Sequence, residues 1–245
     1  LFAFWNAATN PKRALLTTVF LIPWGGLYID VGLWINAYQI SLLALIVMTF
    51  LRSLYSEWRP QPFFGMHWAG IFLTFAILTS LLQIAFIPEI KINASDGVLR
   101  GPTGRAIIQM VMFSFTVSPA ILIPFLMDKP DRAESILRIY ILSAIVLAVV
   151  GWWQMIIWYG TGANPIPINS FNKWLGGQTE TSMGVFNFGD LPIFRMNSLA
   201  GEPRTLGAVF VVAMMMVQAV SATTFNLQRS RIIMIWLCLA VSTLA

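Results

Sequence analysis

The sequence contains a single cysteine and a single histidine among 245 residues. Cys238 lies inside an apolar run, so neither a disulfide framework nor a thiolate metal site is expected. One histidine, His67, likewise excludes most zinc chemistry. The chain also lacks a phosphate-cradling glycine loop, a GxSxG motif and any acidic run that would chelate a metal. We therefore expect neither a metal site nor a bound cofactor.

Charge is scarce as well. Asp, Glu, Lys and Arg make up 10% of the chain, against about 25% in soluble domains, while 58% of the residues are hydrophobic. This composition predicts an all-α, polytopic integral membrane protein. A helix needs about 20 apolar residues to cross a bilayer, and seven segments are candidates: 14–29, 33–51, 67–88, 106–127, 135–159, 204–224 and 231 to the end.

The two ends of this series are less regular. Pro23-Trp24-Gly25-Gly26 interrupts the first segment, which is expected to be kinked, re-entrant or tilted. The last segment, which begins near Ile232, is still apolar at Ala245, where the chain stops. We expect residues 1–245 to form one transmembrane helical domain that is truncated at its C-terminus.

Basic residues predict the orientation. With the N-terminus in the cytoplasm, nine of the fifteen basic residues lie in short inner connections, as the positive-inside rule expects. They are Lys12, Arg13, Arg52, Arg59, Lys129, Arg132, Arg138, Arg229 and Arg231. The segment 160–203 then becomes a long outer loop rich in Gly, Asn and Pro. Its aromatic residues disfavour disorder, so we expect a folded cap.

The stretch Arg195 to Gly207, RMNSLAGEPRTLG, is the strongest candidate site. Pro203 is suited to the first turn of a helix, so the backbone N–H groups around Gly201 would form an anion site, to which Arg195 and Arg204 add bidentate donors. Three roles fit Glu202: a base, a partner that orients an arginine, or a capping acid, of which capping is favoured. Anchoring of the two arginines to lipid phosphate is the alternative.

Arg105 opens the fourth predicted segment on the same side, and Gln109 follows it by four residues, on the same helix face. An arginine with an amide beneath it suits a phosphate or sugar ligand, although a helix-end anchor explains Arg105 equally well. Gln39, Gln83 and Gln154 are expected to be buried amides that form interhelical hydrogen bonds rather than to bind a ligand.

The pattern Arg195-x5-Gly201-Glu202-Pro203-x3-Gly207, after a long outer loop, resembles the O-antigen ligase and O-antigen polymerase family of bacterial inner-membrane proteins. Arg204 departs from the pattern, because an asparagine is common there. Arg105 with Gln109, the run Leu21-Ile22-Pro23 and the terminal run Arg231 to Ala245 are also similar to that family.

The resemblance implies a GT-C-like glycosyltransferase membrane domain that works without a metal at the periplasmic face of the inner membrane. Such a protein transfers an undecaprenyl-pyrophosphate-linked glycan to a hydroxyl on an acceptor glycan or lipid, and has no nucleic-acid partner. The resemblance implies catalytic roles for Arg195, Arg204 and Glu202, with Arg105, Gln109 and Gly201 binding pyrophosphate or glycan. A later outer loop bearing a histidine would be expected downstream. A transporter or permease for an anionic solute remains the alternative.

Overall fold

The computed structural model describes residues 2–30, 34–55, 66–86, 130–162, 185–188, 191–194, 196, 198–200, 203–222 and 229–244, with scattered helical residues between 107 and 126. The chain divides into two compact units, which are described separately. The first unit combines Leu1–Thr49 with Lys129–Ala245, and the second is Phe50–Asp128. Most of the described residues are helical, as the composition predicts.

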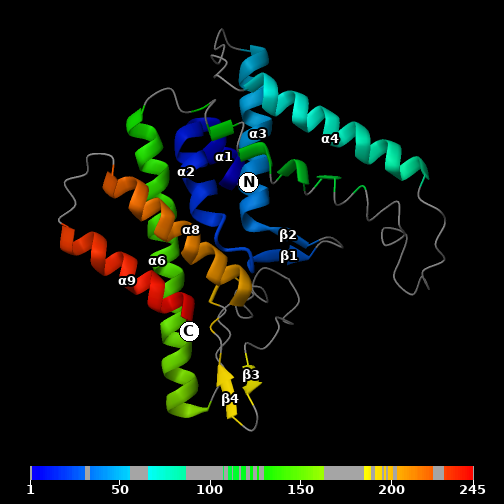
Figure 1. Cartoon of the computed structure of the whole chain (residues 1–245). Coiled ribbons are helices and arrows are strands. Elements are labelled where there is room, and N and C mark those ends of the chain that lie inside the picture. The colour runs from blue at the N-terminus through cyan, green and yellow to red at the C-terminus, as the bar shows by residue number, and fades with distance from the viewer. Residues whose placement is uncertain are drawn as a thin grey trace. The chain divides into compact units, whose positions relative to one another are not determined.

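The first unit is a helical assembly with two short antiparallel hairpins (Figure 1). Its helices are α1 (Phe2–Thr9), α2 (Pro11–Leu21), the start of α3 (Ala37–Tyr55), α6 (Pro130–Thr161), α8 (Pro203–Ala222) and α9 (Arg229–Leu244). One hairpin joins β1 (Tyr28–Asp30) to β2 (Trp34–Asn36), with Ile29 opposite Ile35. The other joins β3 (Val185–Phe188) to β4 (Leu191–Phe194), with Asn187 opposite Pro192.

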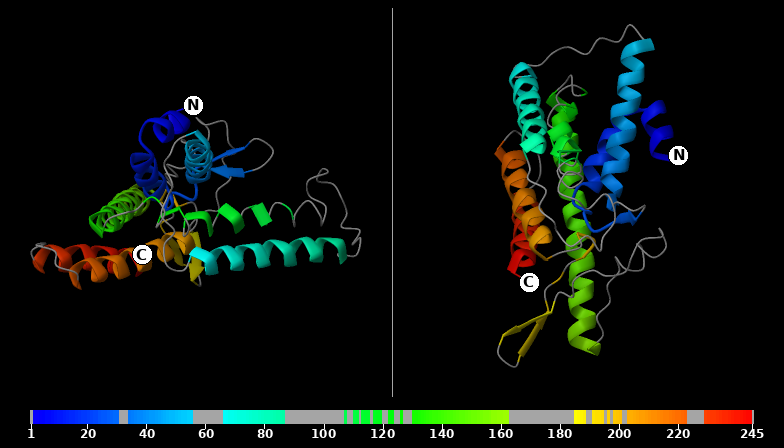
Figure 2. Two further views of the ribbon diagram at one scale, coloured as in Figure 1. Left: turned by 90° about the horizontal axis from the view of Figure 1, so that it is seen from above. Right: turned by 90° about the vertical axis from the view of Figure 1, so that its right-hand side faces the viewer.

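Helix α6 is the centre of this unit and packs against α2, α8 and α9 (Figure 2). Its 32 residues correspond to a length of about 48 Å. Ala144, Ala148 and Gly151 recur along it at helical spacing and are all buried. Small side chains at such positions let neighbouring backbones approach closely, so this stripe explains why several elements can gather around one helix.

Helix α2 is too short to cross a bilayer. It ends at Leu21, one residue before the Ile22-Pro23 bond, because proline lacks the N–H that would continue the helical hydrogen bonds. A turn over 22–27 and strand β1 follow. Eleven residues span about 16 Å, against about 30 Å of hydrocarbon. The expected segment 14–29 is therefore not one helix, and α1, which the sequence did not predict, precedes it.

Two helices in the described part of the chain are long and apolar enough to cross a membrane, Ala37–Tyr55 and Glu134–Thr161. Gly70–Leu82 and Thr205–Gln218 are apolar but shorter, counted over the same residues. Helices also occupy the predicted segments in α4, α8 and α9. The finer prediction of about seven spans stays a prediction.

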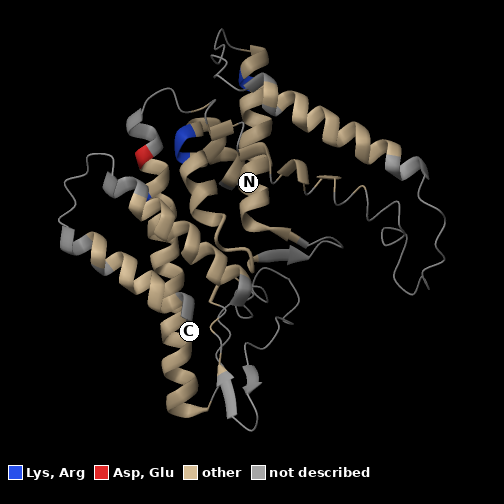
Figure 3. Cartoon of the chain, in the orientation of Figure 1, with Lys and Arg blue, Asp and Glu red and all other residues tan. Residues whose placement is uncertain are grey.

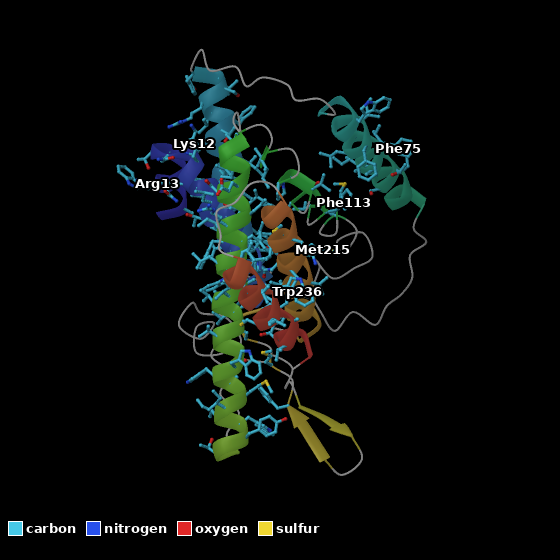
Figure 4. All side chains as sticks on the ribbon, turned by 60° about the vertical axis from the view of Figure 1, so that its left-hand side comes forward. Lys12, Arg13, Phe75, Phe113, Met215 and Trp236 are labelled. Carbon is cyan, nitrogen blue, oxygen red and sulfur yellow. The ribbon has the colours of Figure 1, made fainter. Side chains whose placement is uncertain are left out.

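The second unit contains α4 (Met66–Phe86) and helical residues between Ile107 and Leu126. Phe72 and Phe113 bring these two parts together, with ring centroids 6.4 Å apart. Figure 4 labels Phe113 and also Phe75, which lies about one turn along α4 from Phe72. Much of α4 is apolar and exposed, including Trp68, Ile71 and Phe75. An apolar surface of this kind suits contact with lipid rather than with water.

Candidate functional site

The predicted site residues are only partly described. Five of them lie outside the described residues: Arg105, Gln109, Arg195, Gly201 and Glu202. The backbone of Arg204 is the second residue of α8, but its side chain is likewise outside the described part. Helix α8 begins at Pro203, so the predicted helix start is confirmed, whereas the roles of the six residues stay predictions.

The described residues on either side of Arg195, and those before Gly201, are deeply buried. Met196, Ser198, Leu199 and Ala200, which we call the anchor turn, are between 0% and 4% exposed. They connect strand β4 to helix α8. The stretch that carries the predicted arginines is thus attached to the core of the first unit rather than to a loose surface loop.

Ser198 fastens the anchor turn to α6 with two hydrogen bonds. Its backbone N–H donates to Gln154 Oε1 at 2.7 Å, and its hydroxyl donates to the Leu147 carbonyl oxygen at 2.7 Å. Ser198 has a φ of 48°, a left-handed conformation that is uncommon for a residue other than glycine. Such a conformation costs of order 1–3 kcal/mol and persists only where the surroundings impose it. The two bonds from α6 supply that constraint.

Gly151 and Trp158 extend the same contact along α6. A Cβ atom at Gly151 would come within 2.3 Å of Met196 Sδ and 3.4 Å of Met196 Cβ, so the absence of a side chain lets Met196 lie directly on the helix. About two turns further on, the Trp158 and Phe194 rings stack with centroids 5.3 Å apart. The chain is therefore held on α6 both before and after Arg195.

The turn that follows α2 lies against the anchor turn. The Gly26 N–H donates to the Leu199 carbonyl at 3.2 Å. The Trp24 indole donates to Ser143 Oγ at 2.8 Å, and the Ser143 hydroxyl donates to the Phe20 carbonyl at 2.6 Å. The Trp24 bond fixes the turn over 22–27 to α6, and the Ser143 bond joins α6 to the end of α2. The interruption of the first predicted segment therefore creates the surface against which the anchor turn packs.

Two of the three predicted buried amides can be assessed. Gln39 and Gln154 are both buried, as predicted. Their oxygens accept from backbone N–H groups of Asn36 and Ser198, respectively, so each amide secures a turn, while their predicted role in interhelical hydrogen bonds stays a prediction. The Gln83 side chain lies outside the described residues. Ser143 and Ser198 had no predicted role, since a lone hydroxyl in an apolar run carries little information about its partner.

The described part of this site is a scaffold. Its hydroxyl, amide and indole groups are engaged in the hydrogen bonds just given, and within the described residues no group of three His, Cys, Asp or Glu side chains could hold a metal ion. Any charge chemistry here would have to come from the predicted residues that the scaffold carries. No family model, curated protein or solved structure matches this chain.

The contact between Gly151 and Met196 gives a first prediction. Gly151→Val should lower stability by about 1–3 kcal/mol, because the new carbon atoms would overlap Met196 and force the anchor turn off the helix. Thermal unfolding of the purified protein measures the effect. Gly207→Val is the matched control: it puts the same side chain into a helix where a Cβ would meet nothing within 4 Å. Equal losses in the two variants would contradict the proposed packing.

Proposed function

We propose that this protein is a membrane glycan transferase of the O-antigen ligase or polymerase type. It would move a glycan from undecaprenyl pyrophosphate to a hydroxyl acceptor at the periplasmic face, without a metal. The observation that carries the proposal is the anchor turn. It fastens the chain between Arg195 and Arg204 to α6 and leads into a helix that starts at Pro203. We propose that this attachment positions Arg195 and Arg204 before the reaction. Donors that are preorganised in this way stabilise charge that develops in a transition state.

The distribution of charge along the first unit supports the periplasmic assignment. Lys12 and Arg13 lie in the first turn of α2, and Arg138 lies near the start of α6. Figure 3 shows these charged parts of α2 and α6 at the same end of the two helices, away from the β3–β4 hairpin. Under the positive-inside rule this end faces the cytoplasm. The start of α8, with Arg204, then belongs to the outer half.

In the proposed reaction the acceptor hydroxyl oxygen attacks the anomeric carbon, and the bond from that carbon to the pyrophosphate oxygen breaks with inversion. Arg195 and Arg204 neutralise the departing pyrophosphate through paired N–H donors, which fit phosphate oxygens bidentately. Glu202 orients one of them, or takes the hydroxyl proton. Arg105, Gln109 and the backbone at Gly201 hold the rest of the headgroup. This arrangement would do the work of a divalent cation.

The continuity of α6 favours an enzyme over a transporter. Transporters commonly place their sites near the bilayer midplane, between discontinuous helices. Helix α6 runs unbroken from Pro130 to Thr161. An enzyme that acts on a lipid-linked headgroup needs no broken helix, because the pyrophosphate lies at the membrane surface.

The test is transfer by membranes that contain the whole natural protein. Polyprenyl-pyrophosphate-linked glycan is supplied together with a hydroxyl acceptor, and product is measured with and without a chelator. We expect transfer that the chelator leaves unchanged, because the arginines replace the metal. Activity that disappears with chelator and returns with magnesium would refute the metal-free mechanism. Uptake of an anionic solute without any transfer would support the transporter instead.

A further inference from the structure

Helices α1 and α2 form a compact helical hairpin at the N-terminal end of the first unit. Asn10 caps α2 by accepting the Arg13 N–H at 3.1 Å. The Asn6 amide donates to Thr17 Oγ1 at 3.3 Å, and Ala7 is completely buried. Helix α1 therefore folds back along α2, with one face held against the unit.

The hairpin exposes two aromatic and two basic side chains. Trp5 is 71% exposed and Phe4 is 38% exposed. Lys12 and Arg13 are exposed in the first turn of α2, and both side chains are labelled in Figure 4. We call these four residues the aromatic–basic surface. Exposed apolar patches mark interaction sites on proteins or membranes.

The spacing of the four residues along the axis of α2 matches the depths of the headgroup and acyl layers of a membrane interface. Asn6 lies beside Thr17, which is five residues along α2 from Lys12, or about 8 Å at the rise of an α-helix. Phe4 and Trp5 precede Asn6, so they lie at about this depth or deeper. Interfacial helices bury their apolar face about 5–10 Å into the boundary between headgroups and acyl chains. Lys12 and Arg13 would then lie at the level of lipid phosphates.

Among the side chains that the structure describes, neither Lys12 nor Arg13 has an acidic partner. The first turn of α2 itself contains no acidic residue. Arg138, by contrast, pairs with Glu134 one turn away on α6. Anionic lipids of the cytoplasmic leaflet attract basic residues next to the membrane. An anionic headgroup therefore complements the exposed Lys12 and Arg13 better than a zwitterionic one.

We propose that the aromatic–basic surface docks onto an anionic phospholipid leaflet, with Trp5 and Phe4 among the upper acyl carbons and Lys12 and Arg13 on the phosphates. The hairpin is then a lipid anchor, separate from the proposed periplasmic site and independent of the proposed transfer reaction. Its short length fits this role, since α1 has only eight residues and reaches about 12 Å.

The charge half of the proposal is tested with the whole protein in nanodiscs of pure phosphatidylcholine and in nanodiscs that also contain phosphatidylglycerol. We expect phosphatidylglycerol to raise the unfolding temperature, and the double variant Lys12→Gln/Arg13→Gln to lose most of that rise. Arg138→Gln is the matched control and should keep it, because Arg138 already has an acidic partner. An equal rise in the double variant, or the same rise from inorganic phosphate alone, would overturn lipid docking.

The depth half is tested by cysteine labelling in a Cys238→Ser background. Trp5→Cys should react several-fold more slowly with a membrane-impermeant maleimide in nanodiscs than Thr9→Cys, because Thr9 is exposed next to the Asn10 cap and lies at the headgroup level. Both should react alike after denaturation. Equal rates in the folded protein would place Trp5 in water and refute the anchor.

Discussion

Replacing Arg195 by alanine should lower glycan transfer by about 10²–10³-fold. The expected loss follows from the proposed role, since a donor positioned before the reaction stabilises the charge of the leaving pyrophosphate without reorganisation. Arg195→Lys should restore little of the activity, because lysine keeps the charge but loses the planar fork that binds two phosphate oxygens. The measurement is transfer of polyprenyl-linked glycan at saturating acceptor in membranes that contain the whole natural protein.

Arg138→Ala is the control for this experiment. Arg138 is a partly exposed arginine on α6 that pairs with Glu134, and surface pairs of this kind contribute at most about 1 kcal/mol. It should therefore leave transfer near the wild-type rate. Expression and membrane insertion should be unchanged in all three variants. If Arg195→Ala transferred glycan as fast as Arg138→Ala, Arg195 would be a lipid anchor and the proposed mechanism would be wrong.

Replacing Gln154 by leucine should destabilise the protein by about 1–3 kcal/mol, the cost of leaving a buried donor without its acceptor. Gln154 and Ser198 are both fully buried, so water cannot take the place of the lost oxygen. Ser198 would also lose one of the two bonds that hold its left-handed conformation. We therefore expect the anchor turn to shift, and kcat for transfer to fall more than thermal stability alone would explain.

Gln218→Leu makes the same chemical change at an exposed position of α8 and should cost less stability than Gln154→Leu, because it leaves no fully buried donor without an acceptor. Ser198→Ala separates the two bonds, because it removes the hydroxyl contact to Leu147 but keeps the N–H donor for Gln154. It should be milder than Gln154→Leu. Should Gln154→Leu unfold and transfer glycan like Gln218→Leu, the anchor turn would not be the support of the site.

Features that depend only on a continuous stretch of chain could be predicted from the sequence. Apolar runs place α3 and α6, because the length of such a run reflects the thickness of the bilayer. Pro203 at the start of α8 follows from its own fixed φ, and the interruption at Pro23 follows from its missing N–H. The sequence did not predict α1, because its eight residues are fewer than the run that a span requires.

The support of the candidate site was decided only by the tertiary structure. Ser198 is 44 residues from Gln154 and 51 residues from Leu147, and nothing in either local sequence pairs them. Gly151 reads as one small residue in an apolar helix until Met196 is seen to pack on it. Local sequence determines which elements form because propensity, hydrophobic length and proline geometry are short-range. Which turn is held on which helix depends on the close packing of side chains far apart in the chain, and that packing exists only once the helices have assembled.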